Sequence, residues 1–249
     1  VPQALKINKT LLLSSGSHGK YLGRIDLDVK GGEVVDYSSS LIPVFSDVIT
    51  PDPEMSAHID ALRAPYEAEC NRVIGSTSGL LYRRGNFNGT WDDLICQGII
   101  EERDAEISLS PGFRWGTTLL PGQDITIEDL YTQTSMSYPN VYRTEMTGAQ
   151  IKTILEDVCD NLFNIDPFYQ QGGDMVRVGG MNYTCAPKAS MGNRISDLTM
   201  TKTGEKLDAD RKYVVGGWAS VNENVEGPAI YDLMEGFISR KKSIDLPAQ

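Results

Sequence analysis

One arginine stands between two aromatic residues in a segment rich in turn-forming residues. Residues 110–118 read SPGFRWGTT, so Arg114 lies between Phe113 and Trp115, with a glycine on either side of the three. A guanidinium can donate two parallel hydrogen bonds to a phosphate, sulfate or carboxylate. Backbone N–H groups beside glycines can approach the same anion. The segment therefore predicts an anion-binding loop. The alternatives are an Arg114 paired with a surface aspartate and aromatic rings packed in the core.

Two other glycine-rich segments also hold polar side chains that could meet a ligand. Residues 14–20, SSGSHGK, contain His18, and residues 170–180, QQGGDMVRVGG, contain Asp174 and Arg177. Arg177 could bind an anion, or it could form an internal ion pair with Asp174 that holds the loop. A histidine without an acidic neighbour is more often structural than catalytic. Tyr138, in SMSYPNVY, could stack on a substrate or pack in the core.

The sequence contains no self-sufficient catalytic set. It has two histidines and four cysteines with no C-x-x-C pair, which makes a zinc site improbable. Neither a phosphate-binding G-x-x-x-x-G-K-[ST] motif nor a G-x-S-x-G nucleophile motif is present. The residues thus indicate a binding part without its own chemistry.

The composition of the chain indicates which classes of partner it can bind. Of the 249 residues 40% are hydrophobic and 23% are charged, which is typical of a globular chain. A formal net charge of -11 argues against general nucleic-acid binding, and no apolar run is long enough for a membrane span. We expect a monomer with neither nucleic acid nor membrane as partner. The cysteines could form two disulfides of unassigned pairing, although free buried thiols are favoured; they are Cys70, Cys96, Cys159 and Cys185.

The predicted elements belong to the α+β class with a mixed sheet. A β-hairpin with its turn at KGGE precedes a long amphipathic helix that starts near Pro53 and breaks near Pro65. A helix capped by Thr90 leads to a strand, AEISLS, which runs straight into the loop around Arg114. Residues 149–163 form the clearest amphipathic helix. Further strands are expected at VYRTEMTG, MVRVGGMNYTCAP, RISDLTM and KYVVGGWAS, and a last helix at GPAIYDLMEGFISRK.

Two parts of the chain resemble bacterial 5′-nucleotidases. SSGSHGKYLGRIDLDV followed by LIPV resembles the closing hairpin of their calcineurin-like metallophosphatase domain, and the remainder resembles their C-terminal substrate-binding domain. The resemblance implies that residues 1–49 end a catalytic domain, that residues 50–74 form a linker helix, and that residues 75–249 form the substrate-binding domain.

Three longer segments resemble the thiosulfohydrolase of the bacterial sulfur-oxidation (Sox) system. They are SPGFRWGTTLLPGQDIT, FYQQGGDMVRVGGMNYTCAP and GGWASVNENVEGPAIYDLM. The resemblance implies a periplasmic hydrolase with two manganese ions, which releases sulfate from a cysteine S-thiosulfonate on the flexible C-terminal arm of a sulfur-carrier protein. Its metal ligands end in a Gly-His-x-His motif that is absent here. We therefore expect a C-terminal fragment that binds no metal, contains no catalytic residue and is inactive alone.

The same resemblance gives the candidate residues their roles. Arg114 is expected to bind the terminal sulfonate, with Arg177, oriented by Asp174, as a second candidate and His18 near the metal cleft. The residues expected to line the channel for the carrier arm are Phe113, Trp115 and Tyr138. Two alternatives stay open: a 5′-nucleotidase or related phosphoesterase acting on nucleotides, and a non-catalytic carrier-binding module.

Overall fold

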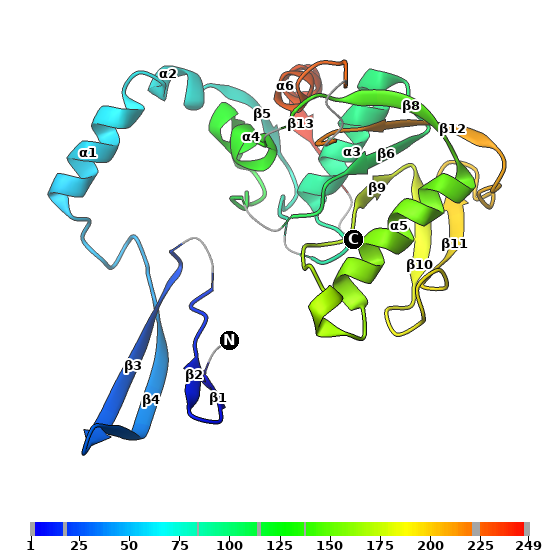
Figure 1. The fold of residues 1–249 in the computed structure, drawn as a ribbon. Coiled ribbons are helices and arrows are strands. Elements are labelled where there is room, and N and C mark those ends of the chain that lie inside the picture. Colours follow the sequence, from blue (N-terminus) through cyan, green and yellow to red (C-terminus); the bar gives the residue numbers. More distant parts are fainter. Residues whose placement is uncertain are drawn as a thin grey trace. The chain divides into compact units, whose positions relative to one another are not determined.

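The chain forms two compact units, Val1–Tyr66 and Glu67–Gln249 (Figure 1). The computed structural model describes residues 3–16, 19–83, 85–113, 116–136, 138–220 and 225–246. The boundary between the units falls within residues 50–74, the segment predicted to be a linker.

The first unit consists of two hairpins and a helix. Strands β1 (Leu5–Ile7) and β2 (Thr10–Leu12) pair antiparallel, and so do β3 (Tyr21–Lys30) and β4 (Glu33–Pro43). The turn between the longer strands is Gly31-Gly32, and both glycines have positive φ, as a tight hairpin turn requires. Helix α1 (Pro53–Arg63) begins at Asp52, whose carboxylate accepts a 2.9 Å hydrogen bond from the N–H of Met55.

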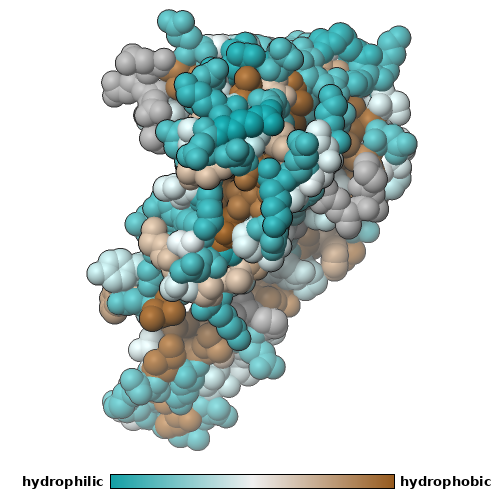
Figure 2. Space-filling model, turned by 90° about the vertical axis from the view of Figure 1, so that its right-hand side faces the viewer, coloured by the Kyte–Doolittle hydropathy of each residue, from teal (hydrophilic) through white to brown (hydrophobic). Residues whose placement is uncertain are grey.

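The described part of this unit contains no buried side chain. The β3–β4 hairpin leaves large hydrophobic side chains exposed on both faces, among them Leu22, Leu27, Val29, Val34 and Val35. Hydrophobic side chains accordingly gather on the lower part of the surface in Figure 2. A two-stranded hairpin is only marginally stable in water without a further surface to bury its apolar face. The residues described in the first unit thus form strands and a helix but no hydrophobic core.

The second unit is built around a four-stranded mixed sheet. Its order is β8 (Tyr142–Thr147), β12 (Lys212–Gly217), β6 (Ile107–Ser110) and β9 (Arg177–Gly179). The central strands β6 and β12 are parallel, while β8 and β9 pair antiparallel to them. Two smaller sheets complete the unit. They are β13 (Ser243–Ile244), β5 (Val73–Thr77) and β7 (Asp124–Thr126), and the pair β10 (Met181–Cys185) and β11 (Ile195–Met200).

Helices cover these sheets and create two hydrophobic clusters. One cluster joins α3 (Thr90–Arg103), α4 (Ile127–Thr134) and α6 (Ile230–Lys241) to the three-stranded sheet. The other joins α5 (Gly148–Phe163) to β6, β10, β11 and β12. The remaining helical pieces are α2 (Glu67–Cys70) and the 3-10 turn η1 (Pro167–Tyr169). Among the described residues, no helix is long and apolar enough to cross a bilayer.

The predicted α+β class with a mixed sheet is confirmed, while two local predictions are wrong. The linker helix predicted over residues 50–74 breaks near Pro65 as expected, because α1 ends at Arg63. However, Val73–Thr77 is strand β5, which pairs with β7 and β13. Thr90 does not cap α3, because Gly89 occupies the N-cap. The Thr90 hydroxyl instead accepts a hydrogen bond from the N–H of Tyr82 and donates one to the Leu80 carbonyl.

Candidate functional site

The candidate site lies where the two parallel strands end. Leu109 of β6 lies opposite Gly217 of β12, so their carboxyl ends are adjacent. Beyond these ends the chain continues into Pro111–Phe113 and Trp218–Ser220. Ligands of sheets with parallel strands commonly bind outside the carboxyl ends. The segment predicted to bind an anion therefore starts at an edge of the sheet suited to a ligand.

A cavity of about 1400 Å³ opens at this edge. Ser110 and Trp218 lie in its wall, and the Trp218 indole Nε1 donates a 2.8 Å hydrogen bond to the Ser110 hydroxyl. Tyr142, at the start of β8, also lines the cavity, and burial raises the pKa of its hydroxyl. The cavity wall thus mixes apolar surface with neutral hydrogen-bonding groups and two charged residues, Arg143 and Glu226. Such a wall suits an extended chain with a polar backbone.

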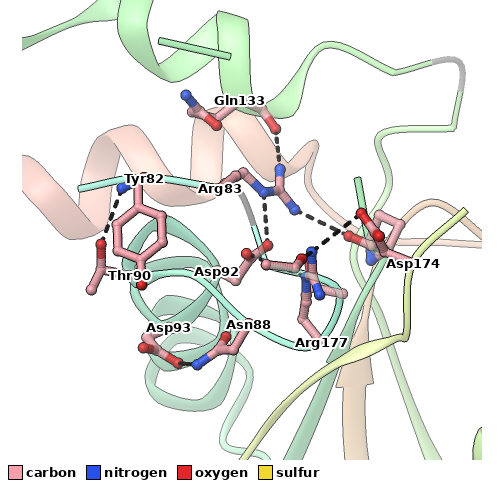
Figure 3. A network of polar contacts seen from close by, with 12 residues as sticks. Tyr82, Arg83, Asn88, Thr90, Asp92, Asp93, Gln133, Asp174 and Arg177 are labelled. Carbon is pink, nitrogen blue, oxygen red and sulfur yellow. Dashed lines mark hydrogen bonds and ion pairs between the residues drawn. The ribbon is translucent and has the colours of Figure 1, made fainter. Parts of the chain in front are cut away.

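Four charged side chains, Arg83, Asp92, Asp174 and Arg177, form a buried cluster (Figure 3). Arg83 Nε lies 2.7 Å from Asp92 Oδ1, and Arg177 Nε lies 3.3 Å from Asp92 Oδ2. Arg177 Nη2 lies 3.5 Å from Asp174 Oδ2. None of the four side chains is more than 2% exposed. Two positive and two negative charges make a formally neutral cluster, in which each charge needs the others because solvent cannot reach it.

Burial and pairing act in opposite directions on these groups. Burial raises the pKa of the Asp92 carboxyl, and the two arginines beside it oppose that rise. Burial likewise lowers the pKa of Arg83, and Asp92 opposes that shift. Removing any member would therefore leave an uncompensated charge in the interior.

Arg83 also anchors the start of the predicted anion-binding loop. Its Nη2 donates a 3.1 Å hydrogen bond to the Pro111 carbonyl, and its guanidinium carbon lies 3.7 Å from the centre of the Phe113 ring. Its Nη1 donates to the Gln133 carbonyl at 2.8 Å. The side chain of Gln133 donates a 3.0 Å hydrogen bond to the Thr117 carbonyl, on the far side of the loop. Residues 111–113 and 117 are thus held from both sides by α4 and the charge cluster.

The cluster ties a second glycine-rich segment to the same place. Arg177 Nη2 donates to the Gly85 carbonyl at 2.7 Å, and the N–H of Met175 donates to the Asn86 carbonyl at 2.9 Å. Residues 85–86 and 174–177 therefore pack against each other beside the start of α3. The described parts of the glycine-rich stretches 110–118 and 170–180, which were identified separately in the sequence, are thus connected by one buried network.

The predicted site residues fall into three environments. Asp174 and Arg177 form the internal ion pair that was one of the two interpretations of their spacing. Phe113 is 5% exposed and packs edge-on against Trp218, with 6.1 Å between ring centres. Tyr138 is half exposed. Three further predicted site residues lie outside the part of the chain that the structure describes, namely His18, Arg114 and Trp115.

Three residues of this network, Arg83, Asp92 and Gln133, were not predicted from the sequence. A signal for Asp92 exists in α3, because Asp92, Ile95, Cys96 and Ile99 share one helix face and all four are buried. A carboxylate in an apolar helix face predicts a buried cation partner. Which cation that is depends on tertiary packing.

The described residues contain no group of three or more His, Cys, Asp or Glu side chains that could hold a metal ion. Asp92 and Asp174 are both paired with arginine. The described residues therefore do not fit a dimanganese centre.

The fold and sequence define the class of this chain. A family model for the 5′-nucleotidase C-terminal domain matches residues 73–230, more than half of the chain, so the chain belongs to that family. This confirms the resemblance to 5′-nucleotidases and places the second unit in a hydrolase family. The comparison with curated protein sequences gave no match.

Three solved structures are similar to this chain to different degrees. The sulfate thiohydrolase SoxB of Thermus thermophilus, in complex with glycerol, is 31% identical with a TM-score of 0.92, over 100% of this chain and 47% of that one. A 5′-nucleotidase precursor, also from Thermus thermophilus, is 16% identical with a TM-score of 0.80, over 100% and 53% of the two chains. The NAD nucleotidase of Haemophilus influenzae is 14% identical with a TM-score of 0.56, over 98% and 55%. The chain spans about half the length of each of these proteins.

Proposed function

We propose that this chain supplies the substrate-binding part of a hydrolase that releases sulfate from a cysteine S-thiosulfonate on a sulfur-carrier protein. The observation that carries the proposal is the 31% identity to the sulfate thiohydrolase over the whole of this chain, against 16% to the 5′-nucleotidase precursor. A site for such a substrate needs a cation for the sulfonate and a groove for the peptide arm. Both features would meet at the carboxyl ends of β6 and β12.

In this proposal Arg114 binds the terminal sulfonate. The buried ion pairs of Arg177 favour Arg114 as the residue that meets the anion, because Arg177 would have to give up Asp174 or Asp92 to do so. The hydrogen bonds of Arg83 and Gln133 fix the flanks of the loop, which favours a preorganised site. The arm would lie along the cavity, where Tyr142 and Trp218 line the wall. Phe113, which is 5% exposed and packs against Trp218, would support that wall from inside. Trp115 and Tyr138 stay proposed contacts of the arm.

The chemistry would belong to a metallophosphatase part of the intact protein, carrying the two manganese ions and operating in the periplasm. The hydrophobic surface of the first unit supports this assignment, since its hairpin needs another surface to bury both faces. Bound manganese would supply the activated water, while this chain binds and orients the sulfonate.

The test is Arg114→Ala in the intact enzyme. Loss of a cation that stabilises the reacting anion should reduce sulfate release from a carrier thiosulfonate by about 10²–10³-fold. Metal content, measured by elemental analysis, should stay at the wild-type level. Arg240→Ala, which removes an exposed arginine of α6, is the matched control and should retain full activity. Wild-type turnover in Arg114→Ala would refute the role of Arg114.

The second candidate is nucleotide hydrolysis, which the family match and the two nucleotidase structures favour. Assaying the intact enzyme on AMP, a UDP-sugar and the carrier thiosulfonate separates the two functions by their kcat/KM values. A preference for AMP would establish the nucleotidase. Carrier binding by this 249-residue chain in the presence of a chelator, with no hydrolysis by any longer form, would indicate a binding module.

A further inference from the structure

Two cysteines that are far apart in the sequence have their sulfur atoms in contact. Cys159 lies on α5 and Cys185 ends β10, and their Sγ atoms are 3.5 Å apart. All four cysteines are free thiols in this structure. Cys70 lies in α2 and Cys96 in α3, where its thiol neighbours Ser108. One of the possible pairings is therefore already assembled by the fold.

We propose that Cys159 and Cys185 are a disulfide site that links α5 to β10. A disulfide needs the sulfurs about 1.5 Å closer than the 3.5 Å seen here, which rotation about the side-chain bonds can supply. Both residues already pack in the hydrophobic cluster between α5 and the sheets, so the fold itself holds the two side chains together. The inference is independent of the proposed function, although an oxidising compartment such as the periplasm would favour the bond.

The two thiols have different access to an oxidant. Cys159 is fully buried, whereas Cys185 is partly exposed and lines a second cavity of about 390 Å³ with Tyr183 and Phe87. Burial, followed by the neighbouring Cys185 thiol, raises the pKa of Cys159 to about 12. Cys185 is therefore the residue that reacts first with an external disulfide.

Oxidised glutathione can serve as the oxidant in a two-step thiol–disulfide exchange. The Cys185 thiolate attacks one glutathione sulfur, which breaks the glutathione disulfide and releases one glutathione thiolate. The Cys159 thiolate then attacks the Cys185 sulfur, forms the new bond and expels the second glutathione. Two electrons pass from the cysteines to glutathione, and the two thiol protons end on the released glutathione molecules.

The bond would close the segment from residue 159 to residue 185, which includes Asp174 and Arg177 of the buried charge cluster. A cross-link restricts the unfolded chain and so stabilises the folded one. Oxidation would thus strengthen the part of the molecule that supports the candidate site from behind.

Peptide mass spectrometry tests the proposal directly. The 249-residue chain is incubated with oxidised glutathione, alkylated in denaturant and digested with trypsin. The expected product joins peptide 153–177 to peptide 178–188 and disappears after reduction. The other two cysteines fall in peptides 64–72 and 85–103, and they should carry the alkyl label as internal controls.

Thermal unfolding gives a second readout. The oxidised wild-type chain should melt about 5 °C or more above the reduced chain. In Cys185→Ser, which changes the more accessible sulfur, oxidation should leave the melting temperature unchanged. Alkylation of all four cysteines after oxidation, glutathione retained on Cys185 alone, or a link to Cys70 or Cys96 would each overturn the proposal.

Discussion

The guanidinium of Arg83 lies over the ring of Phe113, 3.7 Å from its centre. The same guanidinium binds Asp92 inside the protein and donates to the Pro111 carbonyl in the loop. One side chain thus connects the buried charge cluster to the segment that leads to Arg114. The cluster is a structural support for the loop as well as a set of paired charges.

Replacing Arg83 by methionine should destabilise the fold strongly. The variant keeps an apolar side chain of similar length but leaves Asp92 with a single cation and two carbonyls without their donor. Breaking a buried ion pair from one side costs about 3–5 kcal/mol. Urea unfolding should therefore show a loss of about 3 kcal/mol or more in the free energy of unfolding.

Arg240→Met is the matched control for that experiment. Arg240 pairs with Glu102 on the surface, where its side chain is 59% exposed. An exposed pair contributes about 0–1 kcal/mol. Equal losses of unfolding free energy in Arg83→Met and Arg240→Met would show that the buried cluster contributes no more to stability than an exposed ion pair.

Glu156 should make stability depend on acidic pH. Its carboxylate accepts hydrogen bonds from the backbone N–H groups of Gly192, Arg194 and Ile195. Burial acts to raise the pKa of Glu156, but these three bonds and the nearby charge of Lys152 together outweigh it, so the pKa is lowered. A lowered pKa contributes stability that is present above the ordinary value of 4.5 and is lost as the pH falls through the folded-state value.

Glu156→Gln should thus be less stable than the wild type at pH 7, by about 2 kcal/mol, because one strong acceptor is lost. The difference should shrink as the pH falls below 4.5, since the wild-type carboxyl then takes up a proton. Urea unfolding between pH 3 and pH 7 measures both quantities. Glu145→Gln, at an exposed pair with Lys212, is the control. A difference that does not vary with pH would contradict the role given to the carboxylate.

Gly112→Ala should destabilise the fold by crowding the contact between the loop and residues 174–175. A Cβ at this position would meet the Met175 carbonyl and the side chain of Asp174. Neither can withdraw easily, because the N–H of Met175 is bonded to the Asn86 carbonyl and Asp174 is paired with Arg177. We expect a loss of about 1–3 kcal/mol in the free energy of unfolding, the usual range for overpacking.

Gly236→Ala provides the opposite expectation. Gly236 lies within α6, and the nearest atom to an added Cβ is the flexible end of Arg240. Alanine is favoured over glycine in a helix by about 0.5–1 kcal/mol, so this variant should gain stability. If Gly112→Ala and Gly236→Ala changed the free energy of unfolding in the same direction, the effect at Gly112 could not be assigned to crowding.

The two units should behave differently when expressed separately. Residues 67–249 contain both hydrophobic clusters and should unfold cooperatively in urea. Residues 1–66, which bury no side chain within the described part, should give a random-coil circular dichroism spectrum. A cooperative transition in the short piece would show that the hairpins are stable without a further surface.

Local patterns in the sequence predicted much of this fold. The apolar spacing of residues 149–163 corresponds to α5, and the strand before the loop corresponds to β6, because each depends on its own residues. Strand β5 was missed because it is held by β7 and β13 from elsewhere in the chain. For the same reason the sequence could suggest that Arg177 pairs with nearby Asp174, but not that it also meets Asp92. The loop was found from its composition, whereas its support by Arg83 and Gln133 became visible only in three dimensions.

The parallel pairing of β6 and β12 also sets an order of events in folding. The two strands are separated by most of the second unit, including α4, β8 and α5, so their pairing is a contact between segments distant in the chain. Such contacts form late, since long loops must close before they contribute stability. During synthesis the cavity has no second wall until residues 212–220 have left the ribosome. A nascent chain that stops before β12 would carry the loop around Arg114 but no groove beside it.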